Sequence, residues 1–204
     1  MGSDRGAVLD WSVAAQPLAG EAESGDAAVV ASLPDGALVA AVDGLGHGPA
    51  AARAAKVATE FLRNHANEPL LSLIRRCHEA LRTTRGVALS AARFCVRDDT
   101  MSWVGIGNVE GRLVRLRRAH PSNETLIVFR GAAGIHLQRV HAVTLGVRPG
   151  DALVFATDGI DARFGDALTI GRSAEEMARE ILQGHAKPND DALVVVARYL
   201  GKAS

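Results

Sequence analysis

Four short apolar segments of this chain each adjoin an aspartate. Asp43 ends the run LVAAVD and Asp158 ends ALVFATD, and a glycine follows each of them directly. Asp26 and Asp190 come shortly before two further apolar runs, AAVV and ALVVV. Short runs of this kind, rich in valine and bounded by glycine and aspartate, are typical of buried β-strands. The sequence therefore predicts that four carboxylates lie at the ends of four separate strands, where they can meet.

Hydrophobic periodicity and turn residues place the other elements. Residues 34–36 (PDG) indicate a hairpin, Pro49 and Ser173 stand where helices begin, and Gly184 is expected to stop the last helix. Residues 87–117 read as an antiparallel meander. The expected strands cover residues 7–15, 27–33, 37–42, 87–96, 101–108, 112–117, 125–129, 152–157 and 192–199, and the expected helices cover residues 49–66, 69–84 and 174–183.

The order of these elements decides the fold class. Two consecutive helices and one late helix among antiparallel strands do not match the strand-helix alternation of a parallel sheet. We expect an α+β protein with a four-layer αββα sandwich, in which two mostly antiparallel sheets face each other and helices flank them. With 204 residues, 48% of them hydrophobic, the chain is expected to form one domain over residues 1–204.

Composition and charge exclude several classes of partner. The chain has 23 Lys and Arg against 23 Asp and Glu, so no excess of positive charge favours nucleic acid. The apolar runs are shorter than the roughly 20 residues that a membrane span needs, and the N-terminus lacks a signal-peptide pattern. We therefore expect no nucleic-acid partner, no membrane association and a cytoplasmic location.

The aspartate set predicts a site for hard divalent cations, since Mg²⁺ and Mn²⁺ prefer oxygen ligands. Asp43 can bridge two such ions, and Gly44, which has no Cβ, can turn its backbone so that its carbonyl also faces a cation. An isolated Asp-Gly pair is more often a turn. The prediction therefore rests on the whole set of motifs: SGD, VDGLGHG before a helix, PGDALVFATDG, and NDDALVVV near the end.

This order of motifs, from residue 25 to residue 196, resembles the metal-dependent Ser/Thr protein phosphatases of the type 2C superfamily, in the bacterial branch that contains SpoIIE, RsbU and RsbX. The resemblance implies an αββα fold. It also implies that Asp43 and Asp158 serve catalysis, and that two metals activate a water that attacks phosphorus without a covalent intermediate. The implied ligands of the two Mn²⁺ or Mg²⁺ ions are Asp26, Asp43, the Gly44 carbonyl, Asp158 and Asp190.

The chain departs from the eukaryotic type 2C pattern. Gly25 and Asp26 stand in place of a Glu-Asp pair, and Asp161 follows Asp158 by three positions where the family has four. The flap segment is absent, and no upstream arginine for the substrate phosphate can be placed. We therefore expect at most two tightly bound metals.

The two cysteines do not suit a cysteine-based phosphatase, which needs an arginine six positions after its nucleophile. Thr83 stands at that spacing from Cys77, and Met101 from Cys95. Without a CxxC pair or a dense cysteine pattern, both are expected to be small buried hydrophobic residues.

The predicted function is a phosphoserine/phosphothreonine protein phosphatase that depends on Mn²⁺ or Mg²⁺. Because the chain has room for neither membrane spans nor an activator-binding domain, it looks most like RsbX, which implies phosphorylated STAS-domain stressosome proteins as substrates and a role in resetting a stress response. The alternative is a non-catalytic phosphoprotein-binding module that retains the fold. A nuclease is disfavoured by the neutral charge and the few aromatic residues.

Some residues remain open from the sequence. His47 is either a proton donor or a structural residue at a helix start, and Asn108 either serves the site or forms a turn. Asp191 is expected to support the ligands or to be solvated, because it would point away from Asp190 in an extended chain. The basic cluster at Arg112, Arg115, Arg117 and Arg118 is either a solvated strand edge or a docking surface for a phosphorylated partner.

Overall fold

The computed structural model describes residues 8–116, 123–137, 140–168 and 171–202. Their strands form two five-stranded antiparallel sheets and one small hairpin. The first sheet has the order β1 (Leu9–Gln16), β12 (Ala192–Tyr199), β11 (Ala152–Ala156), β6 (Glu110–Val114) and β7 (Asn123–Leu126). The second has the order β10 (Val143–Gly146), β5 (Thr100–Ile106), β4 (Val87–Cys95), β3 (Gly36–Gly44) and β2 (Asp26–Leu33). The hairpin pairs β8 (Gly131–Ala132) with β9 (His136–Leu137).

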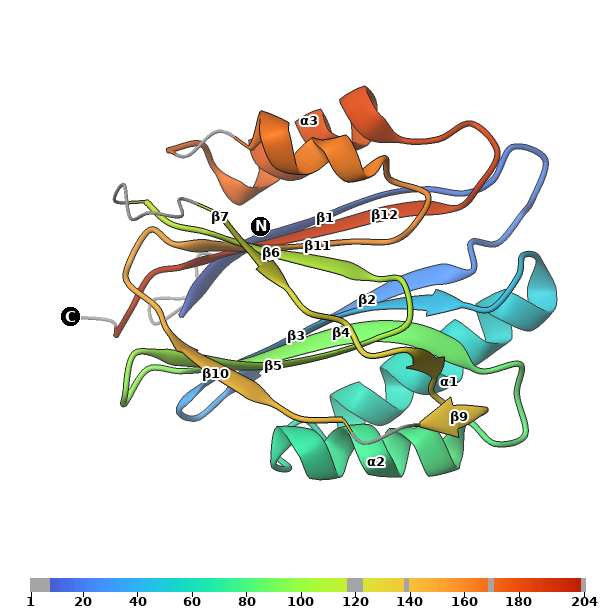
Figure 1. The fold of residues 1–204 in the computed structure, drawn as a ribbon, viewed down its shortest axis with the longest axis horizontal. Helices are drawn as coiled ribbons and strands as arrows, with labels where there is room; N and C mark the ends of the chain where they lie inside the picture. The colour runs from blue at the N-terminus through green and yellow to red at the C-terminus, as the bar shows by residue number, and fades with distance from the viewer. Residues whose placement is uncertain (1–7, 117–122, 138–139, 169–170, 203–204) are drawn as a thin grey trace.

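Helices cover the outer face of each sheet (Figure 1). Helices α1 (Pro49–Asn64) and α2 (Leu70–Ala80) lie on the second sheet, and α3 (Ala174–His185) lies on the first, preceded by the short 3-10 helix η1 (Ala162–Ala167). Each interface has its own buried apolar cluster: one under α1 and α2, one between the sheets and one under α3. The expected α+β, four-layer αββα sandwich is confirmed.

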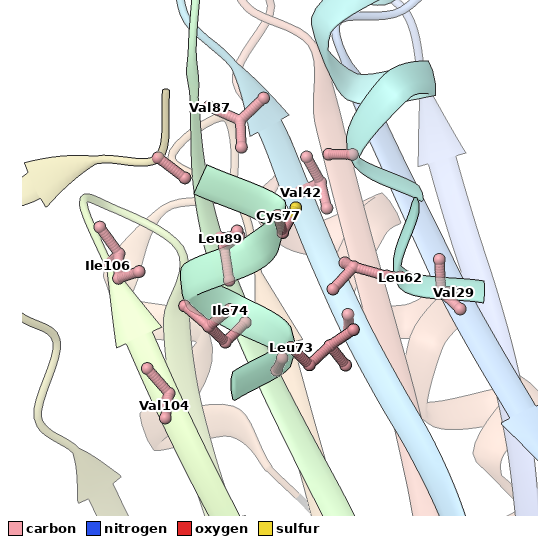
Figure 2. Packing of buried hydrophobic residues seen from close by; sticks show 14 of the residues in the cluster. Val29, Val42, Leu62, Leu73, Ile74, Cys77, Val87, Leu89, Val104 and Ile106 are labelled. Atoms are coloured by element: carbon pink, nitrogen blue, oxygen red, sulfur yellow. The ribbon is translucent and has the colours of Figure 1, made fainter. Parts of the chain in front are cut away.

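The cluster under α1 and α2 follows from the helical spacing of their apolar residues. Leu73, Ile74 and Cys77 of α2 are fully buried and face Leu89 and Val104 of the second sheet (Figure 2). Apolar residues that recur every three or four positions form one stripe on a helix, and burying that stripe is the main source of its stability. Cys77 and Cys95 are both free, and Cys77 is buried as expected while Cys95 is partly exposed.

Large side chains fill the space between the two sheets. Phe94, Trp103, Phe155 and Tyr199 are almost completely buried there, and the rings of Phe94 and Tyr199 stack with centroids 5.8 Å apart. Aromatic pairs of this kind add to the stabilisation that comes from burial alone. They fix the separation of the sheets, and so the distance between the strand ends that each sheet presents.

Three expectations about individual elements were wrong. Residues 87–117 do not form one meander, because β4 pairs with β5 in the second sheet whereas β6 pairs with β11 and β7 in the first. Helix α2 ends at Ala80 and not near residue 84, and Gly184 lies inside α3, which ends at His185. The chain changes sheet at Gly107, whose positive φ of 89° suits glycine.

The short strands β8, β9 and β10 have no clear pattern in the sequence. They are defined by their pairing, β10 with β5 and β8 with β9. Among the described residues, no helix is both long and apolar enough to span a lipid bilayer.

Candidate metal centre

Asp26 and Asp43 face each other across two neighbouring strands. They are directly paired in the antiparallel register of β2 and β3, and the Gly44 amide donates a 2.9 Å hydrogen bond to the Gly25 carbonyl beside them. Side chains of directly opposed residues in such a pair lie about 5 Å apart. The carboxylates of the second sheet are therefore brought together by strand register alone.

Asp158 and Asp190 come from the first sheet, where β11 and β12 are neighbours. Asp158 lies just beyond the end of β11, and Asp190 lies just before the start of β12. The two strands run antiparallel, so these two positions meet at the same end of the sheet. The negative charges of Asp158 and Asp190, which come from the first sheet, both raise the pKa of Asp43 in the second.

One side chain joins the two halves of the site. The Thr157 hydroxyl donates a 2.6 Å hydrogen bond to Asp26 Oδ2 and accepts one of 2.9 Å from the Leu193 amide. Thr157 and Asp26 are both buried. Because the hydroxyl has only one proton and gives it to the carboxylate, Asp26 is held in one orientation toward the first sheet.

Burial and mutual repulsion raise the pKa values of three of these carboxyl groups. The pKa of Asp26 is raised to about 8, chiefly by burial, against the opposing Thr157 hydrogen bond and with the added charge of Asp43. The pKa of Asp43 is raised to about 7, chiefly by burial and then by the charge of Asp158. The pKa of Asp190 is also raised, by burial and by the charge of Asp158. Several carboxylates that lack a counterion in this way are suited to a bound cation.

The donor set fits divalent ions that keep part of their water shell. In the part of the chain that the structure describes, no Lys or Arg forms an ion pair with Asp26, Asp43, Asp158 or Asp190. Nor do three or more acidic, histidine or cysteine side chains there converge on a single point. Mg²⁺ commonly binds through one or two carboxylates and retains several waters. Four carboxylates at the ends of two sheets therefore suit divalent ions that keep part of their water shell.

The two glycines of the Asp-Gly motifs allow close backbone approach. A Cβ on Gly44 would lie 2.3 Å from the Ala51 carbonyl oxygen of α1, and a Cβ on Gly159 would lie 1.8 Å from the Asp191 carbonyl oxygen. Gly44 therefore lets the first turn of α1 pack beside Asp43, and Gly159 lets the turn after Asp158 pack against the start of β12. That the Gly44 carbonyl faces a cation stays a prediction.

Asp191 supports the centre from a buried position. Its two carboxylate oxygens accept 2.8 Å hydrogen bonds from the amides of Leu18 and Gly25, and its side chain is almost fully buried. It thus holds the segment that leads into Asp26. Of the roles considered from the sequence, support is the one that this geometry favours. Asp190 is only partly buried, and its Oδ1 accepts a 2.9 Å hydrogen bond from the Asp191 amide.

Asn108 and Lys187 also contact the site. Asn108 Nδ2 donates a 2.6 Å hydrogen bond to Asp158 Oδ2, so Asn108 serves the site as well as the turn between the sheets. Lys187 Nζ donates a 2.6 Å hydrogen bond to the Asp158 carbonyl oxygen. Sequence reasoning missed both Lys187 and Thr157; the threonine directly before the Asp-Gly motif was the available signal.

Two other candidate residues, His47 and Asp161, have partners other than the four carboxylates. The His47 side chain is 68% exposed, and its Nδ1 lies 3.2 Å from Glu21 Oε1, which favours its structural reading. Asp161 caps η1 and is bound by the Arg163 amide and guanidinium, which lowers its pKa. These bonds already use the Asp161 carboxylate. The expected limit of two tightly bound metals stays a prediction.

The basic cluster is only partly described. Arg117 and Arg118 lie outside the described residues. Arg112 pairs with Glu110, and Arg115 pairs with both Glu124 and Asp151. Strand β6 lies between β11 and β7, so the expectation of a solvated sheet edge was wrong.

Comparison with known proteins identifies the family. Residues 34–200 match the family described as stage II sporulation protein E (SpoIIE). The chain belongs to the SpoIIE family. Phosphoserine phosphatase RsbX of Bacillus subtilis (strain 168) is 24% identical over 164 residues, which cover 79% of this chain and 80% of RsbX. The expected membership of the type 2C superfamily in its RsbX-type branch, and with it the class of metal-dependent protein Ser/Thr phosphatases, is confirmed.

Solved structures agree with this assignment. A crystal structure of RsbX in complex with magnesium superposes with a TM-score of 0.85 at 20% identity, covering 97% of this chain and 98% of that one. A chain from a study of the bacterial stressosome as a modular system that controls secondary messenger signalling has a TM-score of 0.84 at 27% identity, covering 93% of this chain and 99% of that chain. The chain thus shares its overall fold with both of these structures.

Proposed function

We propose that this chain, acting as one catalytic domain over residues 1–204, hydrolyses phosphoserine and phosphothreonine in proteins with the help of two Mn²⁺ or Mg²⁺ ions. The observation that carries the proposal is the placement of four carboxylates at neighbouring strand ends of both sheets, none of them in an ion pair with Lys or Arg among the described residues. Their proposed role, together with the Gly44 carbonyl, is to hold the two ions. The ligands would be Asp26, Asp43, Gly44, Asp158 and Asp190.

Asp43 has the central place in this arrangement. It is paired with Asp26 on one side, and the charge of Asp158 acts on it from the other. We therefore expect that Asp43 would contact both ions and that Asp158 would complete the set on the first sheet. When bound, such a pair of cations supplies Lewis acidity toward the phosphoryl oxygens and lowers the pKa of water.

The residues around the carboxylates have positioning roles. Thr157 orients Asp26, and Asn108 orients Asp158. Groups that hydrogen-bond to metal ligands commonly change metal affinity or activity by about 10-fold to 100-fold when removed. No side-chain nucleophile is needed, and burial raises the pKa of the Cys77 thiol to about 12, which makes it inert.

The proposed substrates are phosphorylated STAS-domain stressosome proteins, whose dephosphorylation would reset a bacterial stress response. The similarity to RsbX and to a chain from a stressosome study supports this substrate class. The cytoplasmic location expected from the sequence stays a prediction.

The activity can be tested with an aryl phosphate and a phosphoserine protein, each with Mn²⁺, with Mg²⁺ and with EDTA. We expect hydrolysis that requires the metal and is abolished in Asp43→Asn. Hydrolysis that survives chelation would overturn the two-metal proposal. Metal-independent binding of the phosphoprotein without hydrolysis would support the non-catalytic module in its place.

The substrate class needs a separate experiment. Mass spectrometry of a phosphorylated STAS-domain protein, before and after treatment, measures loss of each phosphate. An unrelated phosphoserine protein provides the control. Equal rates on both proteins would contradict the proposed preference.

A further inference from the structure

Arg85 is an exposed cation at the rim of the metal centre. The loop that follows Asp43 lies against the start of β4, because Gly44 pairs with Val87 and the Leu45 amide donates a 3.1 Å hydrogen bond to the Gly86 carbonyl. Opposite this loop, a Cβ built on Gly46 would lie 3.1 Å from Arg85 Nη1. The guanidinium therefore stands beside the loop that begins at a proposed metal ligand.

No carboxylate in the described ranges neutralises Arg85. Two arginines of the nearby helical segment behave differently, since Arg76 pairs with Glu68, and Arg82, just beyond α2, pairs with Glu79. Arg85 forms no such pair with a described residue. An exposed guanidinium of this kind can form paired hydrogen bonds with a carboxylate of another chain.

Ile135 stands next to Arg85 on the hairpin formed by β8 and β9. A Cβ built on Gly86 would lie 2.7 Å from Ile135 Cγ1, although the Ile135 side chain is still 60% exposed. Among the large apolar side chains of the described residues, only that of Ile127 is more exposed than that of Ile135.

The hairpin that carries Ile135 is fixed to the core. Ala133 pairs with Val87 through two backbone hydrogen bonds of 2.8 and 2.9 Å, and the Gly134 amide donates a 2.8 Å hydrogen bond to Nδ1 of the buried His78. A Cβ on Gly134 would lie 2.9 Å from the Leu81 carbonyl oxygen, so the tip packs closely on the end of α2. Ile135 is thus presented on a rigid support and loses little entropy on binding.

We infer that Arg85 and Ile135 form a docking point for the substrate polypeptide beside its phosphoserine, where Arg85 binds an acidic side chain and Ile135 contacts an apolar one. The inference rests on the proposed function, which brings a phosphoserine to the four carboxylates. The flanking residues of that substrate must then cross the rim of the site. Charge complementarity favours an acidic segment at Arg85, because acidic residues elsewhere on this rim would be repelled by the four carboxylates of the site.

The test compares substrates that differ only in the flanking residues. Two phosphoserine peptides are used, one with Asp and Leu beside the phosphoserine and one with Ala at both positions, together with p-nitrophenyl phosphate. The measured quantity is the ratio of kcat/KM for the Asp/Leu peptide to kcat/KM for the aryl phosphate. In Arg85→Ala and in Ile135→Ser we expect this ratio to fall by about threefold to tenfold through KM, the size expected of one exposed ion pair or one apolar contact.

Matched controls lie away from the site. Arg63→Ala removes an exposed arginine at the far end of α1, and Leu200→Ser removes a half-exposed leucine after the far end of β12. Both are expected to keep the ratio of the unmodified protein. Equal losses on all three substrates in Arg85→Ala would mean that Arg85 acts on the phosphate or on the fold, and would overturn the docking inference. An unchanged ratio in both rim variants would overturn it as well.

A binding measurement separates this inference from the proposed function. Fluorescence anisotropy of the labelled Asp/Leu phosphopeptide, with Mn²⁺ present, reports binding whether or not the peptide is hydrolysed. If the protein proves inactive yet binds this peptide several-fold more tightly than Arg85→Ala and Ile135→Ser do, the docking point stands and the catalytic proposal fails. Equal binding by all three proteins would overturn the docking point.

Discussion

The Thr157 hydroxyl reaches from the first sheet to Asp26 Oδ2 of the second sheet over 2.6 Å. The two residues are 131 positions apart in the chain, and the bond is buried. It is a direct polar link between the two sheets at the metal centre. The alignment of the metal centre therefore depends on how the two sheets are stacked as well as on the pairing within each sheet.

Replacing this threonine by valine keeps its shape and removes the link. In Thr157→Val we expect a loss of about 1–3 kcal/mol of unfolding free energy, since Asp26 and the Leu193 amide both lose a partner. Mn²⁺ affinity should fall by about 10-fold or more. Urea unfolding and metal titration measure the two effects. Thr59→Val is the matched control, because the buried Thr59 hydroxyl bonds only to carbonyls within α1; similar loss of metal affinity in both variants would contradict the prediction.

Substitutions at the neighbouring residues Asp190 and Asp191 are expected to have different effects on stability and on metal binding. Asp191→Asn places an amide group against the amides of Leu18 and Gly25, so the metal-free protein should lose about 1–3 kcal/mol of unfolding free energy. Asp190→Asn should not destabilise the metal-free protein, because its charge is repelled by Asp158, but it should weaken metal binding. Chemical unfolding with EDTA and calorimetric titration with Mn²⁺ distinguish the two. Equal destabilisation in both variants would contradict the role of Asp191 in supporting the segment before Asp26.

The stability of the metal-free protein should depend on pH with a definite sign. The folded-state pKa values of Asp26 and Asp43, about 8 and about 7, both lie above the value of 3.8 for a free aspartate. The folded state therefore holds protons that the unfolded state releases, and stability is lost as the pH rises from about 4 through 8. We expect the thermal midpoint in EDTA to fall over this range. Asp26→Asn should reduce the slope, and a slope unchanged in that variant would contradict the assignment.

Metal binding should show the complementary dependence. Because the carboxyl groups must lose their protons to bind a cation, added Mn²⁺ should raise the thermal midpoint more at pH 8 than at pH 6. Differential scanning fluorimetry at both pH values provides the measurement. A larger shift at pH 6 would be inconsistent with these groups as ligands.

The glycine after Asp158 should not tolerate a methyl group. In Gly159→Ala the new Cβ would stand 1.8 Å from the Asp191 carbonyl oxygen, so β12 would have to move. We expect a loss of several kcal/mol or failure to fold, as for overpacking against backbone. Gly184→Ala is the control: it lies in α3 with open space around it and should stabilise the protein by about 1 kcal/mol. Thermal unfolding compares the two, and a well-folded Gly159→Ala would disprove the close-approach explanation.

The sequence located the aspartates at the strand ends better than the residues that contact them. Asp43 and Asp158 were identifiable because an apolar run leads directly into Asp-Gly, a local signal. Thr157, Asn108 and Lys187 gain their roles from contacts with partners far away in the chain or in another loop, and no local pattern marks such contacts. The assignment of β6 failed for the same reason, because a strand carries no sign of which sheet it will join.

The sequence by itself therefore determined the four-layer fold class and the aspartates at strand ends, since hydrophobic periodicity and turn residues act locally. The tertiary structure alone decided that Asp26 and Asp43 are directly opposed, that Thr157 links the sheets, and that Asp191 is buried while Asp190 is only partly buried. Those relationships depend on strand register and on the packing of two sheets, which join residues more than a hundred positions apart.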